Sequence, residues 1–118
     1  MNAQGMFKNR YSLDRRMRES SDIVLKYPDR VPVIVETEKK SSLNLDKSKY
    51  LVPKDLTVGQ FLFVLRRRMI LPPEKALFIY CNKVIPPTCM LMGNMYDLYK
   101  EQCGFLYIVV TGENTFGC

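Results

Sequence analysis

The sequence predicts an α+β fold, in which a mixed four-stranded sheet is crossed by one helix and preceded by an N-terminal helical extension. Stretches with apolar residues at helical spacing alternate with short runs rich in β-branched and aromatic residues. The last of these runs, Phe105–Val110, is apolar throughout, which is typical of a central strand that is buried on both faces. At 118 residues the chain has the length of one domain with a short extension.

The first long helix is predicted over Ser12–Tyr27. Pro28 ends it, because a residue that precedes a proline is disfavoured in the helical conformation. Residues 1–10 are expected to form a loose arm or a short extra helix. One face of the long helix is expected to be buried, since its residues recur at a period of 3.6: Leu13, Met17, Ser20, Val24 and Tyr27.

Two strands are predicted next, over Val31–Glu36 and Lys49–Val52, with a polar loop between them. Proline cannot donate to a strand ladder, so Pro32 places the start of the first strand at a sheet edge or a bulge. Pro53 is expected to stop the second strand.

A capping box, Thr57-Val58-Gly59-Gln60, predicts the start of the central helix. Arg66 and Arg67 are expected to face outward, and Pro72-Pro73 ends the helical pattern. The face toward the sheet is predicted from an apolar stripe: Val58, Phe61, Leu62, Leu65 and Met69.

The remaining elements are a strand over Ala76–Cys81, a turn at Asn82-Lys83, a short helix over Met92–Gln102 and a last strand over Phe105–Thr111. After the first helix, the order is therefore β-β-α-β-(α)-β. One helix packed across a mixed four-stranded sheet in this order is the β-grasp arrangement of ubiquitin-like proteins.

The composition argues against an enzyme. The chain has no histidine, which removes the commonest general base and every Ser-His or Cys-His nucleophile, and it has no glycine-rich phosphate loop. Because its four cysteines show no C-x-x-C spacing, no zinc site is expected, and no cofactor is predicted. No disulfide framework is expected either, because nothing marks the chain as secreted. The thiols are expected to be reduced, with Cys81 acting as a small hydrophobe.

The net charge of +6 favours anionic partners, although a solvated basic surface explains it equally well. The longest apolar runs are far shorter than the ~20 residues of a membrane span. The N-terminus has no apolar core, so no secretory signal is expected. The basic residues fall into three groups: Lys8, Arg10, Arg15, Arg16 and Arg18; Lys39, Lys40, Lys47, Lys49 and Lys54; and Arg66, Arg67 and Arg68.

The C-terminus leaves the last strand through a short polar tail and ends in Phe116-Gly117-Cys118. Glycine allows another backbone to approach closely, so a tail that ends in glycine suits a carboxylate that an enzyme activates and joins to an amine. A frayed chain end is the alternative interpretation.

Three stretches resemble the autophagy-related ubiquitin-like modifiers, the family that includes GABARAP. They are residues 26–36 (KYPDRVPVIVE), residues 46–61 (DKSKYLVPKDLTVGQF), and Gly104-Phe105-Leu106-Tyr107 together with the closing Glu113–Gly117. The resemblance runs from about Phe7 to Gly117. It departs at Tyr11-Ser12, where many relatives carry His-Pro; Ser12 can still cap a helix.

The resemblance implies a β-grasp core behind two N-terminal helices. The expected division is a helical extension over residues 1–27, a ubiquitin-like core over 28–111 and a flexible conjugation tail over 112–118. A cysteine protease would remove Cys118, after which activating and conjugating enzymes would pass the carboxylate of Gly117 to phosphatidylethanolamine. The implied locations are the cytoplasm, the autophagosome membrane, and the vacuole or lysosome by delivery.

The resemblance also implies docking of cargo-receptor peptides that carry an aromatic residue and, three positions later, an aliphatic one. Such a peptide adds a strand to the sheet edge and fills two pockets. The implied first pocket is Glu19, Ile23, Pro32, Lys49, Leu51 and Phe105. The implied second pocket is Tyr50, Val52, Pro53, Leu56, Phe61 and Val64. Acidic residues of the peptide would be attracted by Arg30, Lys47, Lys49 and Arg68.

Strand geometry agrees with this division, since Lys49 and Leu51 point to one side of a strand and Tyr50 and Val52 to the other. The alternative is that Tyr50, Val52 and Phe61 are plain core residues. Two other functions remain as alternatives. One is a nucleic-acid-binding module, which the separation of basic and aromatic residues disfavours. The other is a non-conjugated trafficking or microtubule-binding relative, which Gly117 disfavours.

Overall fold

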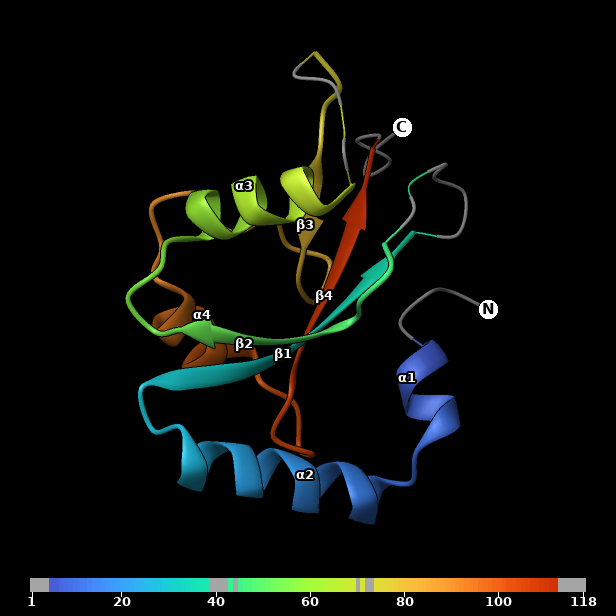
Figure 1. The fold of residues 1–118 in the computed structure, drawn as a ribbon, viewed down its shortest axis with the longest axis vertical. Coiled ribbons are helices and arrows are strands. Elements are labelled where there is room, and N and C mark those ends of the chain that lie inside the picture. Colours follow the sequence, from blue (N-terminus) through green and yellow to red (C-terminus); the bar gives the residue numbers. More distant parts are fainter. Residues whose placement is uncertain (1–4, 39–42, 44, 70, 72–73, 113–118) are drawn as a thin grey trace.

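A computed structural model of the chain describes residues 5–38, 43, 45–69, 71 and 74–112. It confirms the predicted ubiquitin-like fold, in which N-terminal helices precede a mixed four-stranded sheet in the sequence. The sheet lies between helix α2 on one side and helix α3 on the other (Figure 1). The elements are α1 (Gly5–Arg10), α2 (Leu13–Lys26), β1 (Arg30–Thr37), β2 (Lys49–Pro53), α3 (Val58–Met69), β3 (Phe78–Tyr80), α4 (Met92–Tyr99) and β4 (Leu106–Thr111).

The sheet has the strand order β2-β1-β4-β3. The two inner strands, β1 and β4, are parallel, and the outer strands pair antiparallel to them. All residues of β4 are buried, so the prediction of a central last strand is confirmed. Because neighbouring residues of a strand point to opposite faces, the two inner strands contribute side chains to a core on each side of the sheet.

The main core fills the side under α3 and α4. The core on the opposite face, which we call the back cluster, lies under the N-terminal helices and consists of Phe7, Ile34, Cys103, Phe105 and Tyr107. The largest fully buried members of the main core are Phe61, Leu65, Met92, Met95, Leu106 and Ile108.

The two predicted helix caps are confirmed. Thr57 Oγ1 accepts the Gln60 N–H at 3.1 Å, and Gln60 Oε1 accepts the Thr57 N–H at 2.9 Å, which is the reciprocal pair of a capping box. Ser12 Oγ accepts the Arg15 N–H at 3.2 Å and so caps α2. Of residues 1–10, the described part, Gly5–Arg10, forms the short extra helix, and residues 1–4 lie outside the described ranges.

The face of α2 that packs on the sheet differs from the predicted one. Leu13, Met17 and Val24 each remain about 40% exposed, whereas Ser20 is buried. The turn before β4 lies opposite Ser20, and Ser20 Oγ donates to the Cys103 carbonyl at 2.5 Å. Because of this contact, the packed face of α2 is rotated toward Ile23. A polar residue therefore forms the centre of this contact.

The edge position predicted for Pro32 is wrong for the strand as a whole, because β1 lies inside the sheet. Pro32 pairs with Leu51 of β2, but the pairing of β1 with β4 begins only at Val33. On the β4 side, the first residues of β1 therefore have no ladder partner, and a proline is tolerated there.

Two later elements are shorter than predicted. Only Phe78–Tyr80 pairs with β4, because Cys81 instead bonds Val84 across the Asn82-Lys83 turn, where both turn residues have positive φ. The fourth helix stops at Tyr99, not at Gln102. Its end is fixed by the turn into β4, in which the Gly104 N–H donates to the Glu101 carbonyl at 2.8 Å.

Candidate functional site

The candidate site is centred on β2, which is the last strand at one end of the sheet. One edge of β2 pairs with β1, and no strand lies against the other edge within the described ranges. Lys49 and Leu51 are half-buried, while Tyr50 and Val52 are buried in the main core. The predicted alternation of sides along this strand is therefore confirmed, and β2 separates two differently lined surfaces.

The predicted first-pocket residues come from α2, β1, β2 and the turn before β4. Lys49 Nζ contacts the Glu19 carboxylate of α2, and Leu51 lies opposite Pro32 in the sheet register. Phe105, just before β4, is fully buried. Ile23 of α2 packs against the back cluster, to which Phe105 belongs. Phe105 is therefore buried, whereas the half-buried Lys49 and Glu19 form a rim at the surface.

An open hollow of about 580 Å³ borders this rim. Sequence reasoning assigned only Glu19 and Lys49 to a site here, because Tyr11 lies between α1 and α2, the other residues lie on exposed turns of α2, and none of them carries a pattern of its own. The hollow is lined by Tyr11, Arg15, Arg18, Glu19, Asp22 and Lys49.

The predicted second-pocket residues divide into a buried floor and an accessible wall. Val52 and Phe61 are 2% and 1% exposed, and the Tyr50 and Phe61 rings meet edge to face at 5.7 Å, as the plain-core alternative expects. Leu56 and Pro53 are half-buried, and Val64 is 39% exposed. A ligand on this side would therefore meet Leu56 and Val64 first.

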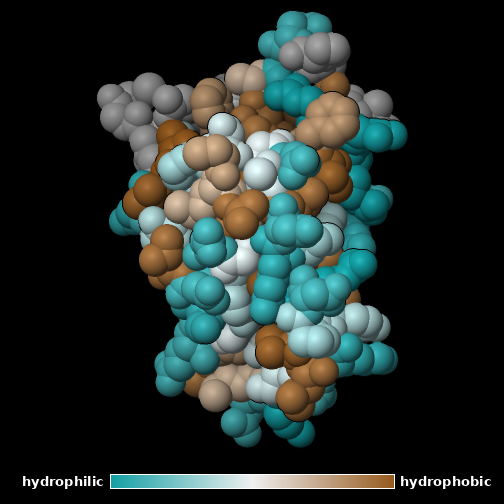
Figure 2. Space-filling view, turned by 90° about the vertical axis from the view of Figure 1, so that its left-hand side faces the viewer, coloured by the Kyte–Doolittle hydropathy of each residue, from teal (hydrophilic) through white to brown (hydrophobic). Residues whose placement is uncertain are grey.

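Leu56 and Val64 also line a mostly apolar hollow of about 520 Å³ that extends along α3 to Phe63 and Cys89. Phe63, which sequence reasoning did not assign to a site, is 59% exposed. Figure 2 shows the side of the molecule that carries α4 and the start of α3, where hydrophobic residues form separate patches among hydrophilic ones.

Three cations predicted to attract acidic residues surround β2. Lys47 Nζ and the Arg68 guanidinium lie 5.1 and 5.9 Å from the centroid of the Tyr50 ring. Arg68 also reaches the Asp46 carboxylate at 3.5 Å. Arg30 is exposed at the start of β1, opposite Pro53. The cations come from three segments: Lys47 precedes the start of β2, Arg30 lies opposite its end, and Arg68 belongs to α3.

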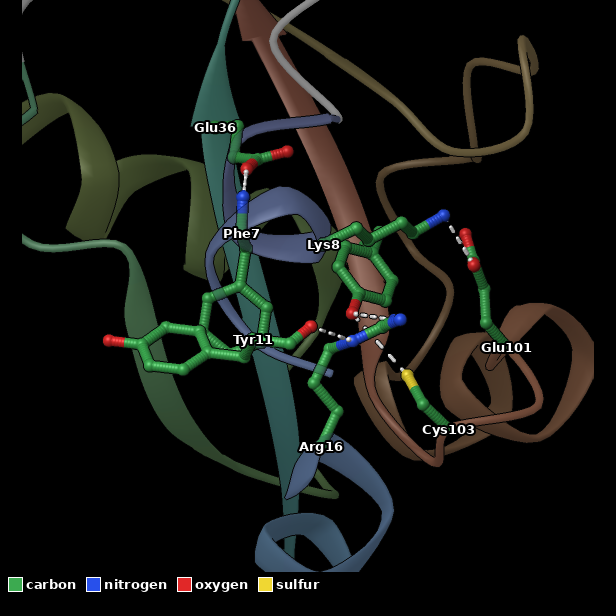
Figure 3. Close-up of polar contacts among 8 residues, drawn as sticks. Phe7, Lys8, Tyr11, Arg16, Glu36, Glu101 and Cys103 are labelled. Atoms are coloured by element: carbon green, nitrogen blue, oxygen red, sulfur yellow. Dashed lines mark hydrogen bonds and ion pairs between the residues drawn. The ribbon is translucent and has the colours of Figure 1, made fainter. Parts of the chain in front are cut away.

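A polar network seals the back of the site, where α1 and α2 meet β4 (Figure 3). Arg16 Nε donates to the Tyr11 carbonyl at 3.1 Å, and Arg16 Nη1 donates to the Tyr107 hydroxyl at 3.2 Å. Burial raises the pKa of Tyr107. Burial also raises the pKa of the Glu36 carboxyl, although the Phe7 N–H and the charge of Lys8 oppose that rise. Because Glu36 and Tyr107 are buried strand residues, these contacts hold α1 and α2 on the sheet.

The Cys81 thiol is buried in the main core. Burial raises the pKa of Cys81 to about 12, so this thiol stays protonated and unreactive at neutral pH, in agreement with its predicted role as a small hydrophobe. Within the described ranges, no three His, Cys, Asp or Glu side chains are grouped to hold a metal ion. No helix in the same ranges is long and apolar enough to cross a membrane. Gly117 and Cys118, the predicted conjugation and cleavage residues, lie outside the described residues.

Comparison with known proteins gives consistent matches over nearly the whole chain. The family model described as autophagy protein Atg8, ubiquitin-like, matches residues 15–117. Autophagy-related protein 8c of Arabidopsis thaliana is 53% identical over 116 residues, which cover 98% of both chains. Autophagy-related protein 8 of Schizosaccharomyces pombe is 52% identical over 115 residues, which cover 97% of this chain and 95% of the relative.

Solved structures agree with these matches. Trypanosoma brucei ATG8 superposes with a TM-score of 0.88 at 42% identity, covering 95% of this chain and 97% of that one. Plasmodium falciparum Atg8, solved in complex with a P. falciparum Atg3 peptide, superposes with a TM-score of 0.84 at 32% identity, covering 91% and 95%. With the fold, the order of its strands and the sequence in agreement, this chain belongs to the Atg8 family of autophagy ubiquitin-like proteins.

Proposed function

We propose that this protein is a ubiquitin-like modifier that is joined through the carboxylate of Gly117 to phosphatidylethanolamine on autophagosomal membranes, where it docks cargo-receptor peptides on β2. The observation that carries the docking proposal is the position of β2. It is an outer strand: Lys49 of β2 lines a charged hollow, and a separate apolar hollow is lined by Leu56, which follows β2, and by Val64 of α3.

A peptide in extended conformation adds to the free edge of β2 through main-chain hydrogen bonds. Its side chains alternate in direction, so an aromatic residue enters the first pocket above Phe105, and an aliphatic residue three positions later reaches Leu56 and Val64. The peptide solved with Plasmodium Atg8 supports peptide recognition by this fold. A micromolar affinity corresponds to about −8 kcal/mol, and a few buried anchors carry most of such an energy.

The cations near β2 favour peptides that carry acidic residues beside the anchors. Lys47, Arg30 and Arg68 are exposed, so their attraction acts mainly on encounter and register and is screened by salt. Lys49 is partly neutralised by its contact with Glu19. An incoming acidic side chain would therefore compete with Glu19 for Lys49.

The conjugation proposal rests on family membership and on a family match that extends to residue 117. A processing protease removes Cys118, and activating and conjugating enzymes then carry the Gly117 carboxylate; the protein supplies no catalysis and needs no cofactor. The two acyl chains of phosphatidylethanolamine are enough for stable anchoring. The chain would thus divide into a helical extension (1–27), a core (28–111) and a tail (112–118), and would move from the cytoplasm to the autophagosome membrane and onward to the vacuole or lysosome.

Leu51→Ala tests the docking proposal. Leu51 is half-buried on the first-pocket side, so its truncation is expected to weaken binding of an aromatic-x-x-Leu peptide by about tenfold or more in calorimetry. Ile85→Ala, which truncates an exposed aliphatic residue beyond β3, is the matched control and should leave affinity unchanged. Tyr50→Ala is a poorer test, because it opens a cavity in the core and costs about 3–5 kcal/mol of stability. Equal affinities for wild type and Leu51→Ala would refute docking at β2.

Gly117→Ala tests the conjugation proposal separately. The variant should fail to be processed and should stay in the soluble fraction during starvation, while its peptide affinity stays unchanged. Membrane attachment of Gly117→Ala would show that the tail is not the conjugation site.

A further inference from the structure

Helix α1 lies directly behind the first pocket. Phe7 is 6% exposed, and its ring meets the Phe105 ring edge to face at 5.4 Å. Phe105 is a predicted residue of the first pocket and is fully buried. Because protein interiors are close-packed, the position of the Phe105 ring depends on what fills the space behind it.

Phe7 also lies under the rim of the pocket. Lys49 Nζ is 5.8 Å from the centroid of the Phe7 ring, while it contacts Glu19 of α2. The ammonium group is thus held between an aromatic face and a carboxylate. If α1 moved away, Phe105 would lose its contact with the Phe7 ring and Lys49 would lose an aromatic neighbour.

Contacts of Phe7 and Lys8 hold α1 on the core. It is a helix of six residues, too short to be stable without tertiary contacts. The Phe7 N–H donates to the buried Glu36 carboxylate at 2.9 Å, and Lys8 Nζ pairs with Glu101 at 2.5 Å, as Figure 3 shows. Lys8 also lies 4.5 Å from the centroid of the Tyr107 ring.

We infer that α1 is a positioning element of the first pocket, so that the Phe7–Glu36 hydrogen bond and the Lys8–Glu101 ion pair control the affinity for the aromatic anchor of a bound peptide. This inference rests on the proposed docking function. Coupling between two binding equilibria is reciprocal, so a bound peptide also holds α1 more firmly on the sheet.

The Lys8–Glu101 pair allows a test that separates docking of α1 from simple charge effects. With an acidic aromatic-x-x-Leu peptide, charge alone predicts that Lys8→Glu weakens binding and Glu101→Lys strengthens it. Control by α1 docking predicts that both changes weaken it, by about fivefold each. The double variant Lys8→Glu with Glu101→Lys restores the pair and should return affinity toward the wild-type value. Lys75→Glu, an exposed charge reversal near β3, is the matched control.

A second measurement uses the wild-type protein, so that it does not depend on how a variant folds. Addition of the peptide should slow hydrogen exchange of the Phe7 amide, which lies on the far side of Phe105 from the pocket. Unchanged exchange in the peptide complex, or opposite effects of the two single charge reversals, would overturn the inference. If Leu51→Ala still weakens binding in that case, the proposed docking function stands without it. If wild type binds no such peptide, both the inference about α1 and the proposed docking function are refuted.

Discussion

Gly104 is the residue whose substitution best tests how the N-terminal helices are fixed to the core. It lies in the turn between α4 and β4 with a φ of +91°, a conformation that residues with a Cβ rarely adopt. A Cβ at this position would overlap Ser20 Oγ and lie 3.0 Å from Ser20 Cβ. Ser20 is buried and donates to the neighbouring Cys103 carbonyl, so it has little freedom to move.

Gly104→Ala should therefore destabilise the protein by about 3 kcal/mol. The unfavourable φ costs about 1–3 kcal/mol. Displacement of Ser20 breaks a buried hydrogen bond and leaves the Cys103 carbonyl without this donor, which adds about 1–3 kcal/mol. The two costs overlap, because the backbone can relax to share them. Ser20→Ala alone removes the hydrogen bond without the backbone strain and should cost about 1–2 kcal/mol.

Urea unfolding followed by circular dichroism measures these costs, provided that the slope of the unfolding free energy with urea stays constant. The double variant is decisive, since the hydrogen bond can be lost only once. Adding Gly104→Ala to Ser20→Ala should cost about 1–2 kcal/mol less than adding it to wild type. Strict additivity, or a cost of Gly104→Ala below about 1 kcal/mol, would refute the argument that Ser20 and this turn are tightly coupled.

Three further predictions concern charge, pH and the tail. Lys47→Glu with Lys49→Glu should weaken binding of an acidic peptide most at low ionic strength, and equal salt sensitivity of wild type and variant in calorimetry would exclude direct attraction. Because burial raises the pKa of Glu36 in the folded state, its contribution to stability is greatest at low pH and is lost as pH rises from about 4.3 through the folded pKa. Urea unfolding across this range should show wild type losing stability relative to Glu36→Gln, and a constant difference would contradict the cause assigned to the shift. Deletion of Cys118 should give a protein that is lipidated in cells lacking the processing protease, and a continued requirement for the protease at first conjugation would contradict the cleavage proposal.

The sequence by itself determined the elements whose signals are local. The capping box at Thr57 and the cap at Ser12 need only neighbouring residues, and both form as predicted. The unbroken apolar run of the last strand gave its central position, because only a strand covered on both faces can bury such a run. Long matching stretches also identified the family, and the alternation along Lys49–Val52 set which side chains face which side of β2.

Only the tertiary structure decided where separate segments meet. The stripe along α2 could not show that the turn at Cys103 would bury Ser20 and leave Met17 half-exposed, because that contact joins residues 83 positions apart. Similarly, nothing near Phe7 in the chain indicates Glu36, 29 residues away, or the ring of Phe105. Periodicity reports which face of an element is apolar, but burial depends on what the fold places opposite that face, and this is decided by contacts between residues far apart in the chain.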